Sequence, residues 1–336
     1  MTWYKNIGPK NQMIISTRVR LARNISGYPF ASKLATEDAE KLINLVWDAL
    51  APIAKDFTLH KIHKISPLKQ QALIEKHLIS PDLTGSNFPR AAIINKDETI
   101  SIMVNEEDHI RIQCLSSGFA PDAVWETANK IDDLLGETLE YAFHEKYGYL
   151  TSCPTNTGTG LRISAMVHLP AIAVSGRISG LLSQAAKSGM TVRGLYGEGS
   201  DAQGNFYQIS NQITLGFSEE ELIERFNKVV SSVCEVENSL RKQLEKDIPP
   251  KLIDRIMRSY GAMRYAYMMS GKEMLNLLSD VRLGIYLGIL NPIPFEKLTS
   301  LMVITMPANI VGSANTMNAQ ERDIKRAKII KETIFK

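Results

Sequence analysis

The sequence predicts an α+β fold: an antiparallel β-sheet flanked by helices, followed by a smaller, mainly helical C-terminal domain. In the first 245 residues, short segments with alternating or β-branched residues are mixed with longer segments whose apolar residues recur at spacings of three and four. Because these segments do not follow a strict strand–helix–strand rhythm, we expect an antiparallel rather than a doubly wound sheet. The prolines of Ile248-Pro249-Pro250 end the long helical pattern before them and mark a domain boundary.

The individual elements are predicted from the period of their apolar residues. Strands are expected at Met13–Leu21, Ala91–Ile94, Thr99–Val104, His109–Cys114, Leu161–Leu169 and Gln208–Leu215. Helices are expected at Glu37–Ala51, Pro67–His77, Pro121–Tyr147, Ile178–Lys187 and Glu219–Lys246.

The two predicted domains, residues 13–246 and 251–336, differ in composition. The second carries 8 of the 13 methionines, and it has 13 basic against 7 acidic residues. The body before it has a small acidic excess, and this contrast indicates two units with different partners. A methionine-rich helical segment is typical of core packing, and an adaptable partner surface is the alternative.

Overall composition excludes several classes of protein. Of the 336 residues, 44% are hydrophobic and 22% are charged, which excludes a disordered chain, a fibre and a coiled-coil rod. There is no apolar run of the ~20 residues that span a membrane, and the N-terminus lacks the apolar core of a signal peptide, so we expect a cytoplasmic protein. The net charge of +3 is too small to indicate a nucleic-acid partner. Three scattered cysteines argue against a disulfide framework and a zinc site.

The first predicted strand carries two arginines on one face. Residues two apart in a strand share a face, so Ser16, Arg18 and Arg20 point the same way. Neighbouring guanidinium groups repel unless an anion lies between them, and polyphosphate suits them because each can bind it with two hydrogen bonds. A solvated strand face with acidic neighbours is the alternative. The opposite face, expected to meet the core, carries Ile15, Thr17, Val19 and Leu21.

Three further arginines repeat this arrangement. Arg111 shares a strand face with His109 and Gln113, and Arg162 opens a strand directly after the glycine-rich residues 157–160. Arg193 opens a second glycine-rich segment, where backbone can approach a ligand closely. Neither a Walker A loop nor a dinucleotide fingerprint is present.

Two further segments carry groups that could act in catalysis. The acidic run 105–109 (Asn-Glu-Glu-Asp-His) follows an apolar strand; it could be a solvated turn, bind Mg²⁺, or hold a cationic substrate and accept its proton. Cys153 precedes a proline and a polar loop, and a lone cysteine of this kind is more often structural than reactive.

Four of these segments together resemble the guanidino (phosphagen) kinase family. The match comprises S-T-R-V-R at 16–20, N-E-E-D-H-I-R at 105–111, C-P-T-N-x-G-T-G at 153–160 and R-G-x-Y-G-E-G-S at 193–200, in the family's order. The resemblance implies an antiparallel catalytic sheet and transfer of a phosphoryl group from ATP, with Mg²⁺, to a guanidinium nitrogen.

Two departures resemble the family's bacterial protein-arginine kinases. Only 15 residues precede Ser16, where small-molecule kinases of the family carry a helical domain, and an added C-terminal segment contains R-D-x-x-R-A at 322–327. On a helix, Arg322 and Arg326 share a face and could clamp a phosphoryl group, while Asp323 meets the guanidinium of the ligand. From charge pattern alone a solvated surface run is the alternative. The resemblance implies a phosphoarginine pocket formed by Arg322, Asp323, Ile324, Lys325, Arg326 and Ala327.

The resemblance also assigns the catalytic and ATP-binding residues. It makes Glu107 the carboxylate that orients the guanidinium and accepts its proton, Glu198 the second substrate carboxylate, and Cys153 the active-site thiol. The implied ATP-binding residues are Ser16, Thr17, Arg18, Val19, Arg20, His77, Arg111, Arg162, Ile163, Ser164, Ala165, Met166, Arg193, Gly194, Leu195, Tyr196, Gly197 and Glu198. No residue is assigned to a protein-held metal.

Partners and alternatives follow from the same resemblance. It implies arginine phosphorylation of protein substrates in stress response and protein quality control, including a heat-shock repressor (CtsR-like) and proteins marked for a Clp protease. An activator (McsA-like), a ClpC-type unfoldase, a homodimer or higher homo-oligomer and allosteric control are also implied, without direct binding of nucleic acid or membrane. A small-molecule guanidino kinase and a non-catalytic phosphoarginine-binding adaptor are the alternatives.

Overall fold

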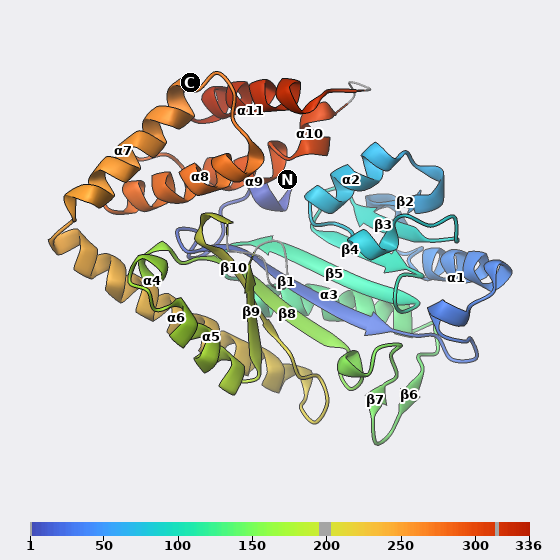
Figure 1. The fold of residues 1–336 in the computed structure, drawn as a ribbon. Coiled ribbons are helices and arrows are strands. Elements are labelled where there is room, and N and C mark those ends of the chain that lie inside the picture. The colour runs from blue at the N-terminus through green and yellow to red at the C-terminus, as the bar shows by residue number, and fades with distance from the viewer. Residues whose placement is uncertain (1, 195–202, 313–315) are drawn as a thin grey trace.

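A computed structural model describes residues 2–194, 203–312 and 316–336 (Figure 1). Its centre is an eight-stranded sheet in the order β2-β3-β4-β5-β1-β8-β10-β9, with every adjacent pair antiparallel. The predicted antiparallel α+β fold is therefore confirmed. The strands are β1 (Ile14–Arg23), β2 (Phe57–Lys61), β3 (Ala91–Asn95), β4 (Ile100–Val104), β5 (Ile110–Ser117), β8 (Leu161–His168), β9 (Met190–Gly194) and β10 (Phe206–Asn211), and a separate ribbon pairs β6 (Phe143–His144) with β7 (Gly148–Tyr149).

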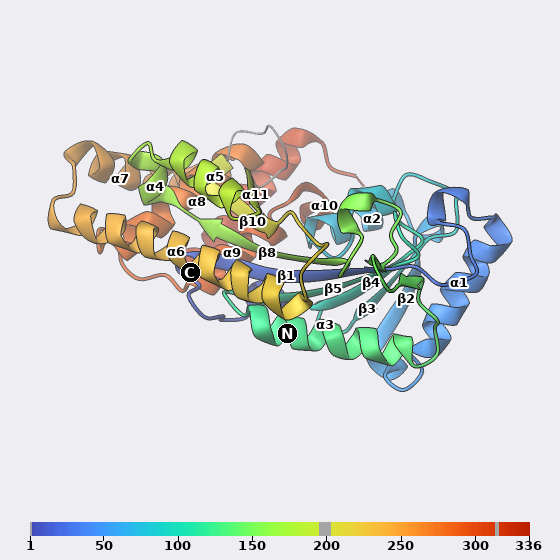
Figure 2. The same ribbon diagram turned by 90° about the horizontal axis from the view of Figure 1, so that it is seen from below.

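Helices cover one face of this sheet and extend beyond one end of it. Figure 2 shows α3 and α6 on the same side of the strands, where their apolar faces join the main hydrophobic core. The C-terminal helices gather at the end of the sheet near the N-terminus (Figure 1). The helices are α1 (Thr36–Ala49), α2 (Pro67–Glu75), α3 (Pro121–Gly136), α4 (Pro170–Val174), α5 (Ile178–Lys187), α6 (Glu219–Lys246), α7 (Pro250–Tyr265), α8 (Gly271–Tyr286), α9 (Phe295–Ile304), α10 (Pro307–Val311) and α11 (Ala319–Ile334).

The boundaries of α6 show why the local sequence forms a helix there. Ser218 accepts a hydrogen bond from the backbone of Glu221, whose side chain accepts one from the Ser218 backbone, so a capping box begins the helix. The prolines 249 and 250 prevent its continuation, and α7 begins at Pro250. These local signals are strong enough that α6 has the bounds predicted for it.

A β-bulge changes one predicted orientation in β1. The pairing register with β8 shifts between Ile14 and Ser16, and a bulge reverses the side on which the following residues point. Ile14 therefore lies in the main core with Val19. The prediction that Ile15 faces that core is wrong: Ile15 packs in a second core with Phe206 and the C-terminal helices.

Other boundaries also differ from prediction. The helix expected at Pro121–Tyr147 ends at Gly136, and the β6–β7 ribbon follows it, because glycines at 136 and 148 interrupt the helical spacing and Gly148 has a φ of 71°. The strand expected at Gln208–Leu215 runs from Phe206 to Asn211. The short strands β2 and β9 were not predicted.

Buried polar contacts join helices to one another and to the sheet. Glu75 of α2 accepts hydrogen bonds from the backbone amides of Ala308 and Asn309 at 2.9 Å each, at the start of α10. Glu237 and Arg241 of α6 form an ion pair at 2.7 Å with fully buried side chains, and Arg241 also donates to the carbonyl of His168 at 3.1 Å. Within the described ranges, no helix is both long and apolar enough to cross a membrane.

Candidate active site

Arginines from three adjacent strands meet on the sheet face turned away from α3 and α6. β1 lies between β5 and β8, and its register places Arg20 opposite Arg162 of β8. Arg111 of β5 is paired with Ala22, two residues beyond Arg20. Arg18, on the same face, donates from Nη2 to Gln208 Oε1 at 3.1 Å. The sheet therefore brings together four of the five arginines that the resemblance assigns to phosphate binding.

These positively charged guanidinium groups repel one another when no anion lies between them. Burial, followed by the charges of Arg162 and Arg111, lowers the pKa of Arg18 to about 10. Burial and the neighbouring arginines likewise lower the pKa of Arg20 well below its usual range. The Nε atoms of Arg20 and Arg162 are buried and have no hydrogen-bond partner among the residues that the structure describes. Unpaired cationic donors fit the oxygens of a polyphosphate, which would supply both the missing acceptors and the compensating charge.

The arginines line a cavity of about 270 Å³. Arg20, Arg111 and Arg162 form one side, and Glu107 and Cys153 lie on its wall. This arrangement combines a cationic surface for phosphates with a carboxylate that could hold a cationic acceptor.

A smaller pocket at Arg18 adjoins the same sheet face. Ser16, Arg18, His77 and Ser164 line it, and Arg18 Nε donates to Ser164 Oγ at 3.4 Å. Burial, and then the charge of Arg18, lower the pKa of His77 to about 4, so its imidazole is neutral at pH 7. Ser16 and His77 thus line the same small pocket as Arg18, and Met166, Gln208 and Leu115 complete its lining.

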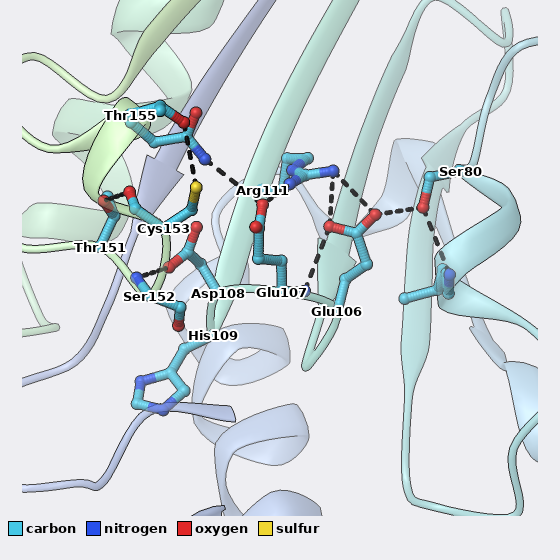
Figure 3. Close-up of polar contacts among 12 residues, drawn as sticks. Ser80, Glu106, Glu107, Asp108, His109, Arg111, Thr151, Ser152, Cys153 and Thr155 are labelled. Carbon is cyan, nitrogen blue, oxygen red and sulfur yellow. Dashed lines mark hydrogen bonds and ion pairs between the residues drawn. The ribbon is translucent and has the colours of Figure 1, made fainter. Parts of the chain in front are cut away.

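The two adjacent glutamates hold Arg111 from two directions (Figure 3). Glu107 Oε2 accepts from Arg111 Nη2 at 2.8 Å and from Asn156 Nδ2 at 3.3 Å, and 41% of its side chain is exposed. Glu106 is buried; it accepts from Arg111 Nη1 at 2.6 Å and from the hydroxyl of Ser80. Glu107 is thus accessible from the cavity, whereas Glu106 anchors the arginine.

Glu106 is a site residue that the sequence analysis did not single out. Its place in the acidic run was the only available signal, because the sequence does not show which of two adjacent carboxylates is buried and which faces the cavity.

Asp108 holds the loop that carries Cys153 (Figure 3). Its Oδ1 accepts from the backbone amide of Ser152 and from Asn24 Nδ2, both at 2.7 Å. Thr151 Oγ1 donates to the carbonyl of Cys153 at 2.7 Å, and Cys153 Sγ lies 3.0 Å from Thr155 Oγ1. The thiol is therefore fixed at the cavity wall by backbone contacts on both sides.

The remaining members of the acidic run have structural contacts. His109 is buried, accepts from the backbone of Ile25 at 3.0 Å through Nδ1, and lies 2.8 Å from the carbonyl of Pro29 through Nε2. Among the described residues, no group of three or more His, Cys, Asp and Glu side chains is arranged to hold a metal ion. The carboxylates of the run instead diverge toward Arg111, Asn24 and the Ser152 backbone.

Four of the residues that the resemblance assigns to ATP binding have side chains that point away from this face of the sheet. The side chains of Val19, Ile163 and Ala165 lie in the main core, and Thr17 donates to the carbonyl of Gly118 at 2.7 Å. Strand alternation turns them away from the arginines, so side-chain contact between these four residues and a nucleotide is excluded in this arrangement.

The fifth arginine lies further out in the sheet. Arg193 of β9 is paired with Gln208 of β10, the residue that accepts from Arg18. Gly194 ends β9. The assigned residues Leu195, Tyr196, Gly197 and Glu198 lie outside the described residues.

The R-D-x-x-R-A segment lies in the first half of α11, and its two arginines have different environments. Arg326 is only 2% exposed, and it donates to the carbonyls of Thr305 at 2.9 Å and Met269 at 2.7 Å and to Asp323. Arg322 is half-buried and donates to the carbonyl of Met317 at 2.7 Å. Backbone carbonyls thus occupy Nε and Nη1 of Arg326, and the clamp by Arg322 and Arg326 stays a prediction. Of the other members, Ile324 and Lys325 are partly exposed and Ala327 is buried.

Comparisons with known families and sequences agree with this geometry. The family model of the ATP:guanido phosphotransferase C-terminal catalytic domain matches residues 38–240, and that of the protein-arginine kinase McsB C-terminal domain matches 249–336. The chain is 46% identical over 329 residues to the protein-arginine kinase of Caldanaerobacter subterraneus subsp. tengcongensis, covering 96% of this chain and 97% of that one. It is 43% identical over 338 residues to the protein-arginine kinase of Bacillus subtilis, covering 99% and 93%.

Solved structures share the same fold. A crystal structure of lombricine kinase superposes with a TM-score of 0.64 at 26% identity over 71% of each chain. The duplicated taurocyamine kinase of Schistosoma mansoni has a TM-score of 0.64 at 24% identity, covering 81% of this chain and 40% of that one. With the two family models and the full-length relatives, these similarities lead to one conclusion: the chain belongs to the ATP:guanido phosphotransferase family and, within it, to the protein-arginine kinases.

Proposed function

We propose that this protein transfers the γ-phosphoryl group of ATP to a guanidinium nitrogen of arginine side chains in other proteins. One observation carries the proposal: Arg20, Arg111 and Arg162 line the same cavity as Glu107. The first three provide positive charge for phosphates, and the last provides negative charge for a guanidinium. Membership of the protein-arginine kinases supports arginine within a protein as the acceptor.

The arginines would act by electrostatic positioning. Arg20 and Arg162 orient the phosphate chain and neutralise the charge that develops on the transferring group, which is what phosphoryl transfer chiefly requires. Their Nε atoms are buried and unpaired among the described residues, so these donors are already removed from water before a phosphate binds. Mg²⁺ would supply further charge between the phosphates, held by phosphate oxygens and water.

Glu107 would prepare the acceptor. Its exposed carboxylate can align the substrate guanidinium and accept the proton that the attacking nitrogen loses as the new N–P bond forms and the bond to ADP breaks. Arg111 and Asn156 hold the carboxylate in place through the same oxygen. Glu198 remains proposed as a second substrate carboxylate, and Cys153 as the supporting thiol on the cavity wall.

A second site on α11 is proposed to bind phosphoarginine. Arg322 and the partly exposed Asp323 are the members of the R-D-x-x-R-A segment that can meet a ligand, with Lys325 beside them. Arg326 would position Asp323, because its Nη1 contacts that carboxylate as well as the carbonyl of Met269, and its Nε holds the carbonyl of Thr305. Binding there is proposed to regulate the kinase allosterically.

The cellular setting follows as part of the proposal. We expect a cytoplasmic enzyme of stress response and protein quality control, assembled as a homodimer or higher homo-oligomer. A CtsR-like repressor would be among its substrates, with an McsA-like activator and a ClpC-type unfoldase as partners.

The activity is tested by incubating the protein with ATP, Mg²⁺ and an arginine-rich protein, then detecting acid-labile phosphoarginine by mass spectrometry. Modification by the parent and none by Glu107→Gln is the expected result. Phosphorylation of free arginine but not of protein would identify a small-molecule guanidino kinase instead. Binding of phosphoarginine without any turnover would identify an adaptor.

A further inference from the structure

A second hollow, of about 550 Å³, lies beside the active-site cavity, between the β6–β7 ribbon and the loop that leads into α6. We call it the ribbon groove. Phe143, Tyr147 and Tyr149 form the wall on the ribbon side, and Leu215 and Phe217 form the opposite wall. Figure 1 shows the ribbon projecting from the end of the sheet that lies away from the C-terminal helices.

The groove presents apolar side chains to solvent on both walls. Phe143 is 58% exposed, Leu215 is 49% exposed and Tyr147 is 44% exposed. Single exposed apolar residues are ordinary, but several that gather around one hollow indicate an interaction site. Aromatic residues are also those that most often anchor a bound polypeptide.

The ribbon wall is held in place from behind. The Tyr149 ring packs edge-to-face against Phe143 at 5.3 Å between centroids, and its centroid lies 3.5 Å from Arg23 Cζ. Arg23 is buried and forms a 2.6 Å ion pair with Asp132 of α3. An ordered aromatic wall loses little conformational entropy when a ligand binds to it.

One segment, residues 155–160, separates the groove from the catalytic cavity. Thr155, Asn156 and Gly160 line the cavity, whereas Gly158 and Thr159 line the groove. Asn156 also contacts Glu107. Two residue steps span at most about 7 Å, so the groove begins within that distance along the backbone from the residue that holds the proposed base.

The segment between the two hollows is firmly packed. Thr214 donates to the carbonyl of Thr157 at 2.7 Å, and a Cβ on Gly158, whose φ is +116°, would come within 2.4 Å of the Thr214 carbonyl oxygen. These contacts therefore fix the distance between the groove and the cavity.

We infer that the ribbon groove binds the polypeptide that flanks the target arginine, as an extended segment with an apolar or aromatic side chain near that arginine. This inference rests on the proposed function, since only a protein substrate has flanking residues. The short distance between the groove and the cavity and the charge of the groove favour this occupant. Glu219 and Glu221 line it against the single basic residue Lys146, which suits a chain whose reacting side chain is cationic.

The test uses two peptides that share one arginine, flanked in one by leucine and phenylalanine and in the other by serine. Steady-state kinetics with the full chain and MgATP are measured for the parent and for the double variant Phe143→Ser, Leu215→Ser. Met257→Ser is the matched control, because Met257 is a similarly exposed apolar residue on α7, outside the groove.

We expect the double variant to raise the KM for the leucine–phenylalanine peptide by fivefold or more. Its kcat, its KM for ATP and its KM for the serine peptide should stay within twofold of the parent, as should all values for Met257→Ser. An unchanged KM for the apolar peptide, or an equal rise for both peptides, would overturn the groove. Failure of the parent to phosphorylate either peptide while it phosphorylates free arginine would instead overturn the proposed function and, with it, the groove.

Discussion

Arg20 of β1 and Arg162 of β8 are direct cross-strand partners in the centre of the sheet. Side chains so placed have Cβ atoms about 5 Å apart, and like charges there destabilise a sheet. Within the described part of the chain, neither Nε has a hydrogen-bond partner. The protein therefore maintains an unfavourable pair where its proposed substrate would supply the compensating charge, so stability and nucleotide binding should respond in opposite directions when the pair is broken.

Arg162→Gln should show this opposition. Without ATP, we expect its free energy of unfolding to equal or exceed that of the parent by up to about 1 kcal/mol, because one cross-strand repulsion is removed. With ATP, the parent should gain about 2.7 kcal/mol at a concentration of 100 Kd, and the variant should gain clearly less at the same concentration. Thermal unfolding with and without the nucleotide measures both. Exposed Arg177→Gln is the control, and an ATP-induced gain in Arg162→Gln equal to the parent's would exclude Arg162 from the site.

Glu107→Gln should retain ATP binding and lose turnover. The change keeps the shape of the side chain but removes its charge and its ability to accept a proton, so the rate should fall by ~10²–10⁴-fold. Phosphoarginine formation and the Kd for ATP are the measurements. Glu137→Gln is the control, since Glu137 is exposed at the end of α3. Turnover of Glu107→Gln within threefold of the parent would show that another group accepts the proton.

His77 should make the protein less stable as the pH falls. Burial and Arg18 lower its folded-state pKa to about 4, whereas an unfolded histidine titrates near 6.5. As the pH falls from about 6.5 to about 4, the unfolded state gains a proton that the folded state does not. The free energy of unfolding therefore decreases by at most about 1.4 kcal/mol for each unit by which the pH falls. Above pH 7 the residue should have no such effect.

The variant His77→Asn isolates this effect. Asparagine tolerates the positive φ of 59° at this position, and it does not titrate. Denaturant unfolding of parent and variant at pH 7.5 and 5 should give a difference in stability that shifts in favour of the variant at the lower pH. The buried His168, whose pKa is also lowered by burial, is common to both proteins and cancels. A pH-independent difference would contradict the lowered pKa.

Substitution of the two arginines of the R-D-x-x-R-A segment should change the free energy of unfolding by different amounts. Arg326→Ala removes a buried cation that joins α11 to Thr305 and Met269, so we expect a loss of about 3 kcal/mol or more. Arg322→Ala removes a half-buried side chain with one backbone contact and should cost about 1 kcal/mol or less. Chemical denaturation measures both.

Phosphoarginine binding completes this test. In a Glu107→Gln background, calorimetry should detect binding of free phosphoarginine that Arg322→Ala abolishes while the protein remains folded. Lys328→Ala serves as the control, because Lys328 is an exposed cation on the same helix. Equal heats with and without Arg322 would exclude the proposed pocket.

Local patterns predicted much of the fold and of the arginine face. The two-residue period along β1 placed Ser16, Arg18 and Arg20 together, and the apolar spacing with the prolines at 249 and 250 predicted the bounds of α6. Such predictions succeed because side-chain direction in a strand and helix termination depend on neighbours a few residues away. The prediction for Ile15 was wrong because a bulge depends on how two distant strands pair.

By itself, the sequence determined the chemical groups, their order and the face of each strand on which they lie. Only the tertiary structure decided which of them meet: β1 between β5 and β8, Glu106 beneath Arg111, Arg326 bound to backbone carbonyls, and the ribbon groove beside the cavity. The physical reason is that strand order and the partners of buried charges depend on contacts between residues far apart in the chain, such as Arg18 and Gln208, which are 190 positions apart. No local period encodes such contacts, and the free energy of burying each charge depends on the partner that the fold supplies.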